Sequence, residues 1–125
     1  MFSCAFTSSL SGKITNLENF STVTFTPSTG ITNNLFIRRC GRVVSVNGYL
    51  SSTSAFGSNQ LLGNIAEGNR PAAPTRFVMG VASAAYEVGD IAYGSIGDNG
   101  EVRITAKSGN TYKKCYFSVS YIVQS

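Results

Sequence analysis

The chain has 125 residues and a net charge of +4, with hydrophobic residues at 42% and charged residues at only 13%. This length fits one domain with a core of its own, and neither a membrane span nor the apolar stretch of a signal peptide is evident. A charged fraction about half of the usual quarter leaves Ser, Thr, Asn and Gly to cover the surface, so we expect part of that surface to be buried in a homo-oligomer.

Polar and apolar residues alternate at strand spacing along most of the chain. Thr75–Val81 is a candidate for a more fully buried strand, whereas Leu61–Ala66 is a candidate for a short helical turn. The other expected strands are, in chain order, 21–26, 35–37, 42–50, 101–105 and 115–123. Their expected inward faces consist of Val44, Val46, Gly48 and Leu50, then Val102 and Ile104, then Cys115, Phe117, Val119 and Tyr121.

Turn signals separate these strands. The strongest is 97–100, because its Asn-Gly pair tolerates the positive φ angles of a tight hairpin. Ser108–Asn110 is a second turn, Cys40–Gly41 is a third turn or a bulge, and 68–74 is an ordered loop before a strand. The sequence therefore predicts an all-β fold, an antiparallel β-sandwich or jelly-roll-like barrel of about eight strands. We expect a single domain over 1–125, with 1–30 as an N-terminal strand and lead-in.

The residue types restrict the chemistry. Without histidine, neither a Ser-His-Asp nor a Cys-His arrangement can form, and the three widely spaced cysteines lack the spacing of a zinc site. Free, buried thiols are expected, with a Cys40–Cys115 bridge as the alternative. We expect no cofactor and no enzyme activity. The remaining catalytic hypothesis is a glycan hydrolase that uses Glu87 and Asp90 as its carboxylate pair.

Basic residues cluster at Arg38-Arg39, close to Arg42, and at Lys113-Lys114. These clusters are either a patch for nucleic acid or the charged starts of strands, which keep sheet edges soluble. No aromatic-plus-basic RNA motif and no recognition helix accompanies them. We therefore favour the second interpretation and expect no nucleic-acid partner.

Four pieces occur in an order that resembles a known family. They are a basic strand leading into Gly41 and paired valines (38–48), a Gly-x-Arg-Pro loop (68–71), an Asp-x-Gly-x-Val-x-Ile hairpin (98–104) and a closing aromatic strand that ends in Tyr121. Together, over about residues 30 to 123, they look like the C-terminal head domains of bacteriophage receptor-binding and baseplate tail proteins. The chain departs from that family in having neither Trp nor His.

The resemblance implies a homotrimer that attaches a virion to a host cell-surface saccharide. Such a protein is assembled in the bacterial cytoplasm with other tail proteins and is carried at the tail tip or baseplate, without membrane insertion. Sugar recognition needs an apolar face for the ring and polar groups for its hydroxyls, which predicts a site made of Tyr86, Glu87, Asp90, Tyr93, Asn110 and Tyr112. The alternative is a purely structural virion protein of the baseplate, neck or head decoration.

Overall fold

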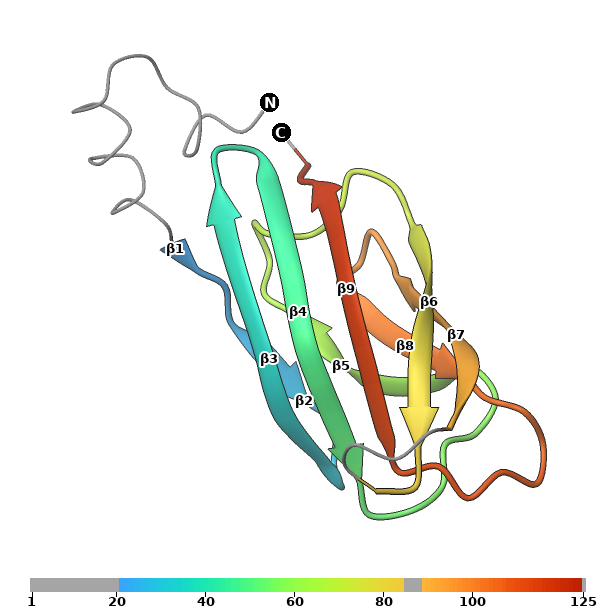
Figure 1. The fold of residues 1–125 in the computed structure, drawn as a ribbon. Coiled ribbons are helices and arrows are strands. Elements are labelled where there is room, and N and C mark those ends of the chain that lie inside the picture. The colour runs from blue at the N-terminus through green and yellow to red at the C-terminus, as the bar shows by residue number, and fades with distance from the viewer. Residues whose placement is uncertain (1–20, 85–88, 125) are drawn as a thin grey trace, which may run out of the picture.

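The computed structural model describes residues 21–84 and 89–124, and these residues form nine strands of one antiparallel sheet. The sheet curls strongly into a half-barrel (Figure 1). The all-β prediction is confirmed, with nine strands in the described ranges instead of about eight. They are β1 (Ser21–Thr22), β2 (Phe25–Pro27), β3 (Ile31–Cys40), β4 (Val43–Ser52), β5 (Gln60–Ile65), β6 (Thr75–Ala82), β7 (Asp90–Ile96), β8 (Glu101–Thr105) and β9 (Lys114–Ile122).

The strand order is β1-β3-β4-β9-β6-β7-β8-β5-β2. The C-terminal strand β9 lies in the middle of the sheet, where it pairs with β4 along its whole length and with β6 at its beginning (Figure 1). The end of the described chain also pairs with another segment, because Pro71 forms a β-bridge with Val123. The expectation that the C-terminal run belongs to a sheet is therefore confirmed.

One short segment connects the two edges of the curled sheet. Ser21 and Thr22 pair with β3, and the Val23 N–H donates to the Ile37 carbonyl at 3.0 Å. The chain then crosses over, so that β2 pairs with β5 on the opposite edge. A sheet with open edges is a template for aggregation, and this crossing covers part of both edges. The single strand expected over 21–26 is consequently two strands in two pairings.

Alternation places the core on one face of the sheet, which we call the inner face. The inward residues predicted on β4, β8 and β9 are buried there, except that Gly48 and Val119 are only half-buried. Two other predictions are wrong. β6 is not a more fully buried strand, since Val78 is exposed, and Leu61–Ala66 holds most of strand β5 instead of a helical turn. Pairing with β8 and β2 overrides the weak local preference of this glycine-interrupted segment.

The three predicted turns are present. After Cys40, the last residue of β3, the turn 41–42 leads into β4; 97–100 joins β7 to β8, and 108–110 lies in the loop before β9. The 68–74 segment is the loop between β5 and β6. Of the N-terminal strand and lead-in expected over 1–30, residues 1–20 lie outside the described residues. No helix in the described ranges is long and apolar enough to cross a membrane.

Cys115 is free and fully buried, so the alternative Cys40–Cys115 bridge does not form. Cys40 is disulfide-bonded, which corrects the expectation of a free thiol at that position. Burial raises the pKa of the Cys115 thiol to about 12. The thiol is therefore both shielded and protonated at neutral pH.

This burial predicts that Cys115 resists alkylation, since the thiolate is the reactive species. We expect iodoacetamide at about pH 8 to leave Cys115 unmodified in the folded chain and to modify it fully in concentrated guanidinium chloride. Site-resolved peptide mass spectrometry measures both states. Rapid modification of the native protein would show that β4 and β9 do not enclose this side chain.

Candidate functional site

The six predicted site residues fall into three groups. Tyr86 and Glu87 lie outside the described residues. Asp90, Asn110 and Tyr112 gather at the end of the sheet where β9 begins, whereas Tyr93 lies on the face opposite the core, which we call the outer face. Asp90 and Tyr93 are only three positions apart, but residues an odd number of positions apart on a strand point to opposite faces.

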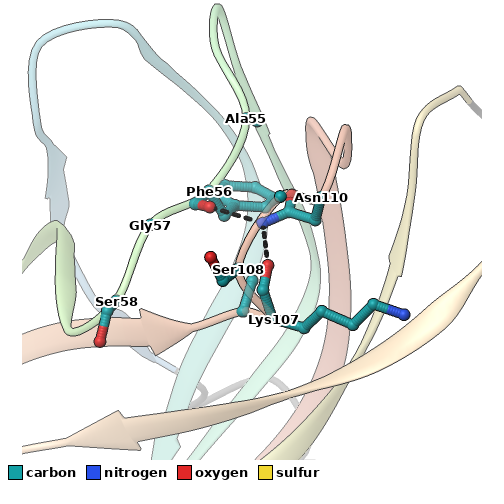
Figure 2. A pocket seen from close by; sticks show the side chains of 9 residues that line it. Ala55, Phe56, Gly57, Ser58, Lys107, Ser108 and Asn110 are labelled. Carbon is teal, nitrogen blue, oxygen red and sulfur yellow. Dashed lines mark hydrogen bonds between the residues drawn. The ribbon is translucent and has the colours of Figure 1, made fainter.

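At the end of the sheet, a hollow of about 480 Å³ lies between the loop that follows β4 and the loop that precedes β9 (Figure 2). Asn110 joins these loops. Its Nδ2 donates to the carbonyl oxygens of Phe56 at 2.8 Å and Lys107 at 2.7 Å, and its Oδ1 accepts the Tyr112 N–H at 2.9 Å. The hydrogen bonds of the amide group are thus engaged within the protein, which makes Asn110 a structural connector and a poor ligand contact.

Asp90 is also engaged. Its Oδ1 accepts the Ile91 N–H at 2.8 Å, and its Oδ2 lies 3.6 Å from Lys107 Nζ. The backbone hydrogen bond from Ile91, with smaller contributions from Lys107 and Tyr112, holds the pKa of Asp90 below its usual value of 3.8. A general acid for glycoside hydrolysis needs a raised pKa, so Asp90 is unsuited to that role.

Among the described residues that line the hollow at Asn110, none offers an exposed aromatic surface. Phe56 is only 2% exposed, so its ring is packed into the core instead of facing a ligand. Ser58 and Ser108 supply hydroxyls, but the Lys107 side chain extends away from the hollow (Figure 2). Stacking on the C–H face of a sugar needs an exposed apolar plane, and the residues lining this hollow do not provide one.

A second, smaller hollow of about 210 Å³ lies around Tyr93. It is lined by Asn59, Arg76, Tyr93, Gly94, Ser95, Arg103 and Thr105. The strand register explains this grouping, because Arg76 pairs with Ser95, Ser95 pairs with Arg103, and Tyr93 pairs with Thr105 in the adjacent row. Three neighbouring strands therefore bring together side chains that are far apart in sequence.

An apolar platform adjoins this hollow on the outer face. Tyr93 is 66% exposed, and it pairs directly with Val78, which is 55% exposed. Ile91, which is 58% exposed, lies opposite Gly80, whose missing side chain leaves the surface flat there. A flat apolar surface beside guanidinium, hydroxyl and amide groups is the combination that recognises a sugar ring.

Arg76 and Arg103 were not among the predicted site residues. Alternation along 101–105 indicates that Arg103 faces away from the core, but nothing in the local pattern places either arginine near Tyr93. Of the basic pair Arg38-Arg39, Arg39 has a structural role. The guanidinium of Arg39 donates to the carbonyls of Gly41 and Gly68 and to the Asn69 side chain.

Among the described residues, no group of three or more His, Cys, Asp or Glu side chains is placed to hold a metal ion. Comparisons with protein-family models and with curated protein sequences find no match.

The curled nine-stranded sheet has the fold of a phage receptor-binding protein. In a comparison with solved structures, the chain is similar to the receptor-binding protein gp15 of Listeria phage PSA, with a TM-score of 0.64 and 13% sequence identity. The match covers 95% of this chain and 82% of that protein. The predicted resemblance to phage receptor-binding proteins is thereby confirmed at the level of the fold.

Proposed function

We propose that this chain is the receptor-binding head of a bacteriophage tail and that it recognises a saccharide on the host cell surface. The observation that carries this proposal is the likeness of its fold to gp15 over 95% of the chain. The role is binding without catalysis. A fold alone does not define a function, so the proposal also depends on a surface with the chemistry for sugars.

The hollow at Tyr93 supplies that surface. The exposed Tyr93 ring and its neighbour Val78 offer an apolar plane, and the hydroxyls of Ser95 and Thr105 lie beside it. In this proposal Tyr93 stacks against a sugar ring, while the polar groups of the hollow hydrogen-bond to its hydroxyls. Of the predicted site residues, Tyr93 is the one we retain as a ligand contact.

The proposed assembly is a homotrimer, built with other tail proteins in the bacterial cytoplasm and carried at the tail tip or baseplate. The low charge of the chain and its exposed apolar side chains support association. A trimer has a solution mass of about 40 kDa, three times the chain mass of 13.3 kDa. Analytical ultracentrifugation measures this mass, and a monomer at micromolar concentration would reject the quaternary part of the proposal.

Saccharide recognition predicts a specific effect of Tyr93→Ala. We expect this variant to bind bacterial cell walls about tenfold more weakly than the wild type, because the stacking surface is lost. Phe36→Ala is the matched control, since Phe36 is equally exposed (68%) but lies on β3, away from the hollow. Sedimentation with purified walls measures both variants. Equal binding by the two variants would exclude Tyr93 as a contact.

The second candidate function is a purely structural virion protein of the baseplate, neck or head decoration. It is favoured by the exposed apolar side chains Phe36, Val78, Ile91, Tyr93 and Ile122, which suit a protein partner as well as a sugar. Periodate treatment of the walls distinguishes the two functions. Binding that survives oxidation of the wall saccharides would count against the saccharide and for a protein ligand.

A further inference from the structure

Arg76 differs from the other arginines of the chain. Its guanidinium has no hydrogen-bond or ion-pair partner within 21–84 and 89–124, although it is exposed at the mouth of the hollow at Tyr93. The arginines with protein acceptors for their guanidinium groups are Arg39, Arg42, Arg70 and Arg103, and Arg38 is engaged as well. The five donors of Arg76 are therefore available to a ligand.

Arg103, on the other side of the hollow, is held in place. Its Nη2 and Nε donate to Glu101 Oε1 at 3.1 and 3.2 Å, and its Nη1 donates to the Asn59 carbonyl at 2.9 Å. The hydrogen bond from Arg103, followed by one from Asn99, lowers the pKa of Glu101, so this carboxylate offsets the charge of Arg103. The uncompensated positive charge of the hollow consequently belongs to Arg76.

The register sets the geometry of the two arginines. Arg76 and Arg103 flank Ser95 in one row across β6, β7 and β8, which places their Cα atoms two strand spacings, about 10 Å, apart. An anionic group above Ser95 would lie between the strand positions of the two arginines and beside Tyr93, which is two residues away on β7. Guanidinium groups bind carboxylate and phosphate through paired, charge-assisted hydrogen bonds.

We infer that the hollow at Tyr93 takes an acidic saccharide, whose carboxylate or phosphate group is bound by Arg76 with Arg103 beside it. This inference deepens the proposed function, on which its saccharide part rests. The anion-binding part stands on the arginine geometry alone. The two parts can therefore be tested separately on the full chain.

The anion part is tested with inorganic phosphate and acetate as probes. We expect each anion, titrated at constant ionic strength against chloride, to shift the Nε–H NMR signal of Arg76 in a saturable way. The anion that reaches half-saturation at the lower concentration identifies the preferred group, phosphate or carboxylate. The Nε–H of Arg39, which donates to Gly41, is the internal control and should not move. An Arg76 signal that stays still, or that moves equally with chloride, would overturn the inference.

The saccharide part is tested on an array of purified bacterial surface polysaccharides, acidic and neutral. We expect binding to acidic polysaccharides to fall about tenfold in Arg76→Gln and to recover partly in Arg76→Lys. Lys113→Gln removes the same charge from an exposed residue outside the hollow and should bind like the wild type. Saturable binding that is confined to neutral polysaccharides, or that Arg76→Gln leaves unchanged, rejects the acidic ligand but keeps the receptor-binding function. Binding to no polysaccharide rejects both.

Discussion

Leu50→Ala is expected to lower the free energy of unfolding by about 3 kcal/mol, because truncation of a buried leucine combines lost burial with a cavity. Leu50 is fully buried on the inner face of β4, between its partners Asn33 on β3 and Cys115 on β9. These central strands form one wall of the curled sheet. A cavity there cannot close without shifting the pairing of two long strands.

Urea denaturation of the variant and the wild type measures this effect. Ile122→Ala is the matched control, because Ile122 lies on β9 and is 58% exposed on the outer face. We expect it to cost less than about 1 kcal/mol, the range of strand propensity alone. Equal losses in both variants would contradict the assignment of inner and outer faces.

Gly48→Ala is the second substitution with a large expected effect. Gly48 has a φ of +125°, and a Cβ atom there would collide with the Asn34 carbonyl oxygen and lie 3.1 Å from Leu35 Cα. Both contacts are with backbone of the adjacent strand β3, which cannot move without breaking the hairpin. Strain at this φ and the collision together predict a loss of about 3 kcal/mol.

Gly68→Ala separates these two causes. Gly68 also has a positive φ, +94°, but a Cβ atom there meets nothing within 4 Å. We expect a loss of about 1 kcal/mol, from backbone strain alone. Thermal unfolding of both variants gives the comparison. If Gly48→Ala cost no more than Gly68→Ala, β3 and β4 would not approach each other as closely as the structure indicates.

The strand faces could be predicted from sequence because side-chain direction in a strand depends on a period of two. The inward residues of β4 and β8 follow directly from this rule. The closure of the sheet could not be predicted, because Ser21–Thr26 has one continuous alternation but pairs with two strands on opposite edges. Pairing partners depend on long-range contacts, which local periodicity does not contain.

The same limit applies to the site. Asp90 and Tyr93 were predicted to belong to one site, but the pleat of β7 directs them to opposite faces. Asn110 was correctly placed near a turn, yet its amide is engaged by backbone groups of two loops. Arg76 and Arg103 meet Tyr93 only because β7 lies between β6 and β8. That order is a property of the assembled sheet.

We propose that this curled β sheet binds a host saccharide. This proposal is tested most directly by equilibrium binding of the full chain to an array of purified bacterial surface polysaccharides. We expect saturable binding to at least one polysaccharide, which the same polysaccharide in free form competes away. Saturable binding to none of them, by protein shown to be folded and trimeric in the same buffer, would contradict it.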